Sequence, residues 1–263
     1  MKIYILTMDD PIKTNDFIKS IVDSKKDDIV GLAVTKGNRL TISKKKSKLL
    51  YLFSLLLIMG PINFTKNIII TLVHKFKILL SKINLLTDPT LIGYANKNNI
   101  ESRYVSNPND KKFIEYLKKI NPDLIINQSQ CIIKKEILSI PKKGVINRHN
   151  AILPRNRGRL TPFWVLFNGD KETGVSIHFL NEKIDDGDII VQKTFNIQET
   201  DDFNSVVTKN YKIAKLAIIE ALEIIENGKV SAQKNDKRKS TYNTIPSVRQ
   251  AWIFRKRIIN KFI

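Results

Sequence analysis

The sequence predicts an α/β fold in which a mostly parallel sheet is covered by helices on both faces. The main observation is that short apolar segments alternate along the chain with longer segments of helical periodicity. The chain of 263 residues is long enough for a substantial core, and 42% hydrophobic with 27% charged residues is typical of a globular protein. This composition excludes wholesale disorder, a collagen-like repeat and a multi-span membrane protein.

Each element follows from its local pattern. Apolar segments predict strands at 2–8, 29–35, 101–105, 124–126, 144–149, 175–179 and 189–191. Helices are expected at 15–24, 108–120 and 202–227. Because parallel sheets bind ligands at the carboxyl ends of their strands, we expect chemistry just after Ile126 and Ile146.

The alternation stops between residues 41 and 90. Three consecutive lysines, 44–46, precede an apolar segment at 49–59, and a second segment at 68–86 mixes Ile and Leu with lysine. The first segment is shorter than the roughly twenty residues that a membrane span requires. The sequence leaves three interpretations open: a helical insertion packed on the domain, a homodimer surface, or a basic amphipathic pair on an anionic membrane.

The charge balance of 45 basic and 25 acidic residues gives a net charge of +20, most of it from lysine. Such an excess fits either attraction to phosphates and anionic lipid or a merely solvated basic surface. A single cysteine, Cys131, excludes an intramolecular disulfide and a zinc site of several thiolates. With no signal-peptide pattern at 1–6, we expect a cytoplasmic protein, at most attached to the inner face of the membrane.

Two side chains at the end of one predicted strand suit acyl transfer. Asn147 and His149 are separated by one residue, so they point to the same side of the strand. An amide can donate to an oxyanion and an imidazole can handle a proton, while Asp185 is the candidate carboxylate for orienting the imidazole. The pattern is weak in isolation, because Asn-x-His also recurs by chance.

Other polar residues have more ordinary explanations. His74 and His178 are expected to serve packing or solvent contact. The acidic segment 185–188 is interpreted as a solvated turn, because one short loop does not supply the oxygen ligands of a cation. We therefore expect no metal.

Taken together, three motifs resemble the 10-formyltetrahydrofolate-dependent formyltransferase family. They are Asn147-Arg148-His149, then Leu153-Pro154 with Arg157-Gly158, then Asp185-Asp186-Gly187-Asp188. The similarity is clearest over 122–195. It implies a three-layer Rossmann-like formyltransferase fold, 10-formyltetrahydrofolate as the formyl donor, and a primary amine as the acceptor.

The resemblance also implies roles for individual residues. The catalytic residues would be Asn147 and His149, on either side of the formyl carbon, and Asp185, which would support proton transfer. The pterin would lie near the strand end at 126–128 and under the turn at 153–154. The backbone of the loop 181–186 would contact its edge. The residues implied in folate binding are Asn127, Gln128, Leu153, Pro154, Asn181 and Asp186. The polar stretch 127–130 departs from the more apolar, glycine-containing stretch expected of the family.

The acceptor is inferred from what the chain has beside these motifs. Thr7–Pro11 is not the glycine-rich loop of family members that act on glycinamide ribonucleotide. Only about sixty residues follow Asp202, too few for the second domain of members that act on methionyl-tRNA. The segment 242–257, with Tyr242 and Trp252, resembles the endings of formyltransferases for amino-sugar nucleotides. We expect such a nucleotide, used for surface polysaccharide, and no nucleic-acid partner.

These expectations define the domain organisation and the alternatives. Residues 1–230 would form the catalytic domain with the helical insertion at about 41–90, and 231–263 a basic C-terminal extension. The sequence leaves open a methionyl-tRNA or glycinamide ribonucleotide formyltransferase-like activity and a formyl-folate hydrolase. A non-catalytic, membrane-associated binding protein is a further alternative.

Overall fold

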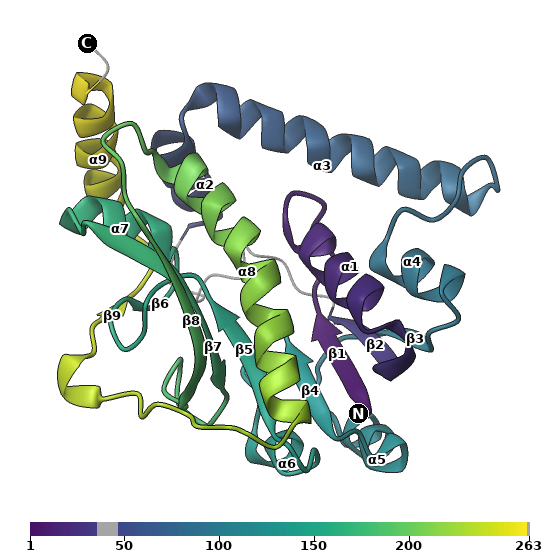
Figure 1. The fold of residues 1–263 in the computed structure, drawn as a ribbon. Coiled ribbons are helices and arrows are strands. Elements are labelled where there is room, and N and C mark those ends of the chain that lie inside the picture. Colours follow the sequence, from purple (N-terminus) through teal and green to yellow (C-terminus); the bar gives the residue numbers. More distant parts are fainter. Residues whose placement is uncertain (36–46, 262–263) are drawn as a thin grey trace.

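The computed structural model, which describes residues 1–35 and 47–261, is built on a central seven-stranded sheet with the order β3-β2-β1-β4-β5-β7-β8 (Figure 1). The first five strands in this order run parallel, whereas β7 and β8 are antiparallel to their neighbours. The strands are β1 (Ile3–Thr7), β2 (Ile29–Thr35), β3 (Ser102–Val105), β4 (Leu124–Asn127), β5 (Val145–His149), β7 (Glu172–Phe179) and β8 (Ile189–Asn196). Each predicted strand is present, and β8 extends five residues beyond the predicted end at Val191.

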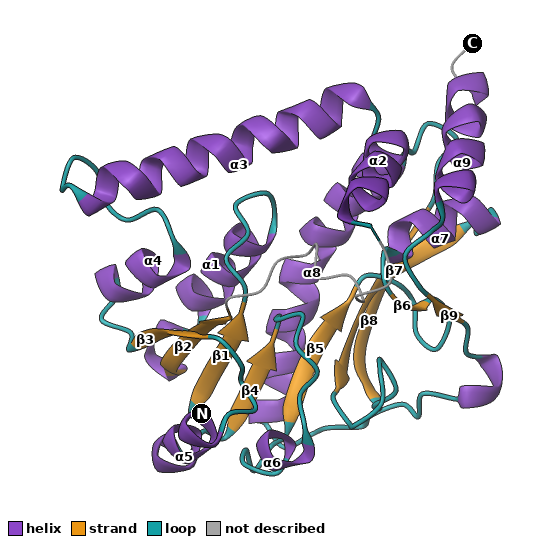
Figure 2. Ribbon diagram, turned by 180° about the vertical axis from the view of Figure 1, so that it is seen from behind, coloured by secondary structure: helices purple, strands orange, loops and turns teal. Residues whose placement is uncertain are grey.

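Helices cover both faces of this sheet (Figures 1 and 2). One face packs against α1 (Thr14–Ser24), α4 (Leu91–Lys97) and α8 (Phe203–Glu226), and the other against α5 (Lys111–Ile120) and α6 (Lys135–Leu138). Short 3₁₀ helices lie at Lys26–Asp28 and Lys237–Lys239. The predicted three-layer α/β fold with a mostly parallel sheet is therefore confirmed.

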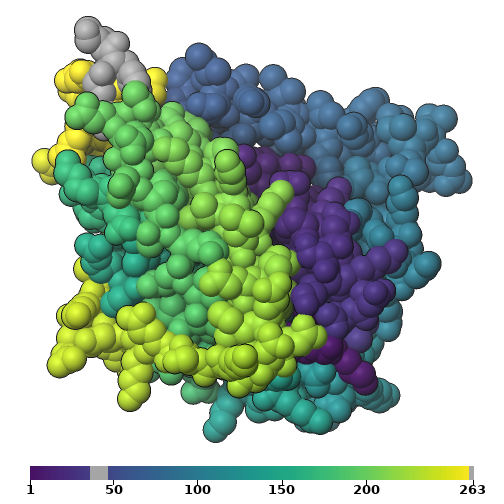
Figure 3. All heavy atoms as spheres, in the orientation of Figure 1, coloured from purple at the N-terminus to yellow at the C-terminus, as the bar shows by residue number. Residues whose placement is uncertain are grey.

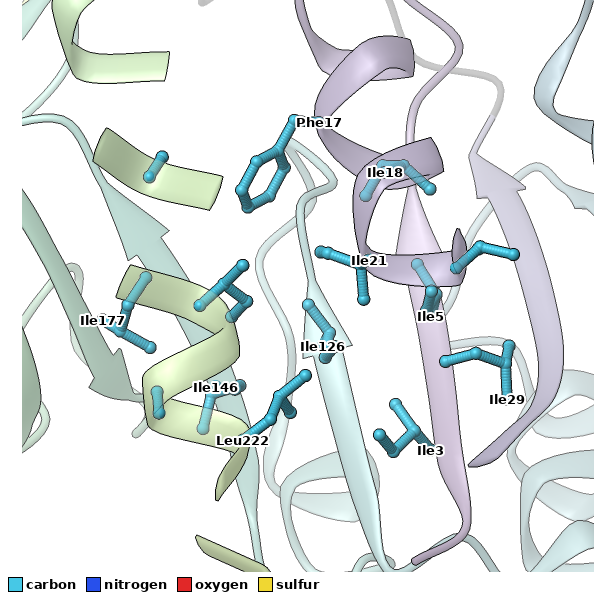
Figure 4. Packing of buried hydrophobic residues seen from close by; sticks show 14 of the residues in the cluster. Ile3, Ile5, Phe17, Ile18, Ile21, Ile29, Ile126, Ile146, Ile177 and Leu222 are labelled. Atoms are coloured by element: carbon cyan, nitrogen blue, oxygen red, sulfur yellow. The ribbon is translucent and has the colours of Figure 1, made fainter. Parts of the chain in front are cut away.

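The main core lies between the sheet and the helices α1 and α8. Ile5 and Ile126 of the sheet face Phe17 and Ile21 of α1, and Leu222 comes from α8 (Figure 4). The apolar residues Phe17, Ile18, Ile21 and Val22 of α1 recur at helical spacing and are all buried. Hydrophobic burial of this kind fixes the strand ends relative to one another, and so fixes the residues that follow them.

The segment where the alternation stops contains two helices, α2 (Lys48–Met59) and α3 (Pro61–Lys82), joined at Gly60. The three consecutive lysines at 44–46 lie outside the described residues. Leu57 and Ile58 of α2 pack against Phe163 of α7 (Thr161–Asn168) and Phe254 of α9 (Val248–Lys261). No side chain of α3 is buried.

None of the described helices is by itself both long and apolar enough to cross a bilayer, although α2 and α3 together meet that criterion as a pair bent by 120°.

The C-terminal part of the chain returns to the body of the protein. There β9 (Tyr242–Asn243) pairs in parallel with β6 (Arg157–Gly158) in a small second sheet. Gly158 has φ +100°, and a Cβ at this position would lie 2.1 Å from the carbonyl oxygen of Asn243. Only glycine permits this close pairing. The division of the chain at residue 230 stays a prediction.

Candidate functional site

Asn147 and His149 lie at the carboxyl end of β5, beside a second histidine. Antiparallel pairing places Asn147 opposite His178 of β7, and His149 opposite Ser176. The Asn147 Nδ2 atom lies 3.5 Å from His178 Nε2, and the two imidazole centroids are 6.4 Å apart. The two predicted residues therefore share one side of the strand, as the period of two requires.

Asp185 reaches this pair from the loop between β7 and β8. Its Oδ2 atom lies 3.4 Å from His149 Nδ1 and accepts a hydrogen bond of 2.9 Å from the backbone N–H of Gly158. Its Oδ1 atom lies 3.7 Å from His178 Nε2. The structure thus brings the three residues predicted as catalytic into one cluster. The interpretation of the acidic segment as a solvated turn is wrong for Asp185 and Asp186, which are both buried.

The surroundings of His149 favour its protonated form. Its Nδ1 faces the Asp185 carboxylate, and its Nε2 lies 2.8 Å from the carbonyl oxygen of Asn156. Burial alone would lower the pKa of His149, but the carboxylate and this carbonyl raise it above its ordinary value. A neutral imidazole could donate to only one of these two acceptors, whereas an imidazolium donates to both.

The pKa of Asp185 moves in the opposite direction. Burial opposes ionisation of the carboxyl group, but His149 outweighs that effect and, with the Gly158 N–H, holds the pKa of Asp185 well below its usual range. The raised pKa of His149 and the lowered pKa of Asp185 thus both favour the charged forms of this buried pair.

His178 is neutral and presents an acceptor to the cluster. Burial lowers its pKa to about 4. Its Nδ1 donates to the carbonyl oxygen of Phe179 at 2.8 Å, which leaves Nε2 unprotonated and facing the Asn147 amide. We expected packing or solvent contact for His178, and it is fully buried. Its place in the cluster comes from the antiparallel pairing of β5 and β7, which the local pattern does not reveal.

A chain of hydrogen bonds fixes the orientation of the Asn147 amide. The Arg148 Nε–H, which can only donate, bonds to Gln128 Oε1 at 2.9 Å. Gln128 Nε2 then donates to Asn147 Oδ1 at 3.0 Å, so the Nδ2 hydrogens of Asn147 point toward His178 and the site. The Arg148 guanidinium is itself held over the rings of Phe17 and Tyr211. The Asn147 side chain therefore presents its Nδ2–H groups as hydrogen-bond donors to the site.

The side chains implied in folate binding are mostly engaged with the protein. Asn127 Oδ1 accepts from the Ser129 hydroxyl, and Gln128 holds Asn147. Asp186 is paired with Arg157 at 2.7 Å and accepts from the exposed Asn181 at 3.2 Å.

The turn at 153–154 is tied by its backbone to β7 and β8. Leu153 is buried and donates its backbone N–H to Ser176 Oγ, and the Leu153–Pro154 peptide bond is cis. The carbonyl oxygen of Leu153 accepts a hydrogen bond of 2.8 Å from Gln192 Nε2, so both backbone polar groups of Leu153 are bonded within the protein.

Comparisons with known proteins give a consistent family. Residues 80–222, more than half of the chain, match the model of the family described as formyl transferase. The chain is 35% identical over 150 residues to the methionyl-tRNA formyltransferase of Fusobacterium nucleatum, covering 57% of this chain and 48% of that relative. It is 37% identical over 136 residues to the bifunctional polymyxin resistance protein ArnA of Wigglesworthia glossinidia, covering 51% of this chain and 21% of that one.

The fold also matches solved structures. One is the N-formyltransferase from Helicobacter canadensis in complex with folinic acid and dTDP-3-aminofucose, at a TM-score of 0.59 and 18% identity, covering 93% of this chain and 71% of that one. At this identity the likeness concerns the fold. The chain spans about half the length, or less, of the two curated relatives described above.

Proposed function

Because the chain belongs to the formyl transferase family, we propose that it moves a formyl group from 10-formyltetrahydrofolate to a primary amine. The observation that carries the proposal is the cluster at the end of β5, where the Asn147 amide, the His149 imidazole and the Asp185 carboxylate meet. Such a cluster supplies donors for an oxyanion and an acceptor for a proton.

In the proposed reaction the amine nitrogen attacks the formyl carbon, forming a new C–N bond and an oxyanion. The Asn147 Nδ2–H and the protonated His149 stabilise this oxyanion. The bond between the formyl carbon and the folate nitrogen then breaks, and tetrahydrofolate leaves. Asp185 removes the amine proton, directly or through water, and the same proton is passed on to the leaving folate nitrogen, so that protons balance.

The contact between His149 and Asn156 supports this role for the imidazolium. The carbonyl oxygen of Asn156 lies 2.8 Å from His149 Nε2 and is an acceptor of the same kind as a formyl oxygen. We propose that the formyl oxygen replaces it when the donor binds. This exchange requires the Asn156 carbonyl group to move away from His149, and it leaves the contact between His149 and Asp185 intact.

For the acceptor we propose an amino-sugar nucleotide. The Helicobacter canadensis structure holds such a nucleotide together with folinic acid on the same fold. Tyr242 supports the proposal, because it is about half exposed and pairs with Arg157, one residue before Gly158, whose N–H binds Asp185. An exposed ring at this place can stack on a nucleotide base.

A second candidate acceptor is methionyl-tRNA. The 35% identity to the Fusobacterium nucleatum enzyme and the net charge of +20 favour it. The two acceptors make different demands on Tyr242, because a base-stacking role concerns the base of an amino-sugar nucleotide and not the methionyl group.

The test mixes the purified chain with 10-formyltetrahydrofolate and, separately, a panel of amino-sugar nucleotides or methionyl-tRNA. Tetrahydrofolate release and the formylated product are measured. We expect formylation of an amino-sugar nucleotide, with Tyr242→Ala raising KM for that acceptor and not for the folate. Formylation of methionyl-tRNA alone would overturn the acceptor assignment.

The same assay tests the proposed chemistry. We expect His149→Ala and Asp185→Ala each to lower kcat by about a hundredfold or more, with circular dichroism unchanged. Tetrahydrofolate release without any amine would identify a hydrolase, and no release would favour a binding protein. Wild-type turnover in either variant would remove these residues from the mechanism.

A further inference from the structure

Helix α3 carries a row of exposed apolar residues on the side that faces away from the protein. We call this side the outer face, made of Ile62, Ile69, Leu72, Val73, Phe76 and Leu79, all of which are exposed. The half-buried opposite side contains Asn63, Asn67, Thr71 and His74 beside Phe64, Ile70 and Ile78. A surface helix of a soluble domain normally shows the reverse arrangement.

Lysines flank the outer face along both of its edges. At about 100° per residue, the six apolar residues fall within an arc of about 120°. Lys66 and Lys77 border one edge of that arc, and Lys75 and Lys82 border the other. The aliphatic stem of lysine can lie along an apolar surface while its ammonium group extends to a charged layer.

No acidic residue accompanies these lysines. The sequence contains no Asp or Glu between Asp28 and Asp88, so every charged residue of α2 and α3 is basic. A second copy of the chain, docked face to face, would place lysines against lysines without a carboxylate to pair them, on molecules that each carry +20. Anionic lipid headgroups supply the opposite charge and an apolar layer beneath it.

The way α3 is attached determines how it could meet a bilayer. Leu57 and Ile58 anchor α2 in the body of the protein, and the chain bends by 120° between the two helices. His74 holds the middle of α3 to Asp9, with its Nε2 atom 3.2 Å from the carboxylate. These contacts keep α3 parallel to the surface of the molecule, where it forms a ridge along one edge (Figure 3).

We propose that α3 lies in the plane of an anionic membrane, with its outer face inserted at the boundary between headgroups and acyl chains and its flanking lysines on the headgroups. Asp9 follows β1, so α3 crosses the carboxyl edge of the sheet (Figures 1 and 2). When α3 docks, the sheet edge that carries Asn147 and His149 therefore faces the bilayer.

The test is vesicle flotation of the full chain with two kinds of liposome, phosphatidylcholine alone or phosphatidylcholine with about one third phosphatidylglycerol. We expect flotation with the anionic vesicles and much less with the neutral ones. The salt concentration is then raised tenfold, which shortens the range of charge attraction and should weaken binding.

Two variant pairs make the test specific. Leu72→Gln with Phe76→Gln should reduce flotation by about tenfold or more, because the inserted apolar area is lost. Leu216→Gln on α8 is the matched control, because Leu216 is 62% exposed and Leu72 59%. Lys66→Gln with Lys77→Gln should weaken binding, whereas Lys111→Gln with Lys112→Gln on α5 should not.

The proposal is overturned if the wild-type chain stays with the unbound fraction or binds neutral vesicles equally well. It is also overturned if the variant with Leu72→Gln and Phe76→Gln floats as well as the wild type. Sedimentation without lipid reports the competing occupant: a wild-type dimer that Leu72→Gln with Phe76→Gln converts to a monomer, with no flotation, would assign the outer face to self-association. Flotation does not depend on formyl transfer, so failure of either proposal leaves the other one standing.

Discussion

At the scale of single residues, the protonation of His149 follows from which atoms surround it. Both ring nitrogens face acceptors, the Asp185 carboxylate and the Asn156 carbonyl oxygen. The neighbouring His178 bonds to a carbonyl through one nitrogen only and stays neutral. Two buried histidines 6.4 Å apart thus have pKa values shifted in opposite directions, because their partners differ.

The first prediction concerns pH. His149 has a raised pKa, so its protonated form is fully present below the ordinary value of 6.5 and is lost as pH rises through the folded-state value. We expect kcat/KM to fall on the alkaline side, and Asp185→Asn to move that limb to lower pH. A pH profile of each protein checks this, and an unmoved limb would assign it to another group.

The second prediction concerns Gln128 as a positioning residue. Gln128→Met keeps the size of the side chain but removes the donor that holds Asn147 Oδ1. We expect kcat to fall by about tenfold or more, with KM for the folate unchanged, because the Asn147 amide is free to rotate. Gln130→Met, at an exposed position three residues beyond the strand, is the control. A raised KM with normal kcat would instead place Gln128 against the folate.

At the scale of elements, the cluster depends on segments that are far apart in the chain. Asp185 is held by the backbone of Gly158 in β6, and β6 is held by β9 near the C-terminus. Asn235 adds a tie from the segment before β9, with its Nδ2 donating to the carbonyl oxygen of Asp185 at 2.9 Å. The residues after the large sheet therefore complete the site that β5 begins.

The third prediction tests this dependence. Gly158→Ala puts a Cβ 2.1 Å from the Asn243 carbonyl oxygen at a residue of φ +100°. We expect the unfolding free energy to fall by about 1 to 3 kcal/mol and the activity to fall with it, because the bond to Asp185 moves. Gly228→Ala is the control, since Gly228 also has a positive φ, +67°, but nothing within 4 Å. Urea unfolding and the formylation assay distinguish the two, and full activity in Gly158→Ala would contradict the coupling.

At the scale of the whole molecule, one cluster joins α2 and α9 to α7 and α8. Phe254 of α9 meets Leu57 of α2 and Phe163 of α7, with the Phe163 and Phe254 ring centroids 5.1 Å apart. Burial of these side chains fixes α2, and with it the position of α3. The proposed membrane helix is therefore held in place through the packing of α9 on α2.

The fourth prediction is that Phe254→Ala lowers the unfolding free energy by about 3 to 5 kcal/mol. Phe254 is fully buried, so its removal leaves a cavity among three helices. Trp252→Ala, at a half-exposed position in the same helix, should change the stability by only about 0.5 kcal/mol. Thermal and urea unfolding measure both. Equal effects would show that α9 does not anchor the cluster.

Much of the architecture could be predicted because its signals are local. The strand at 29–35 and the long helix α8 lie where the apolar patterns place them, because burial of one face imposes a period on the sequence. The short helix α4 and helix α7 were not predicted, since their seven and eight residues give too little periodicity to recognise. The antiparallel direction of β7 and β8 also has no local signal.

The amino-acid sequence by itself determined the α/β class, the family motifs and the identity of Asn147, His149 and Asp185 as candidates, because apolar periodicity and motif spacing are properties of the linear chain. Only the tertiary structure decided that His178 joins the cluster, that Gln128 orients Asn147, and that the apolar side of α3 faces outward. The physical reason is that hydrogen-bond partners and exposure arise from strand pairing and helix packing between segments distant in sequence.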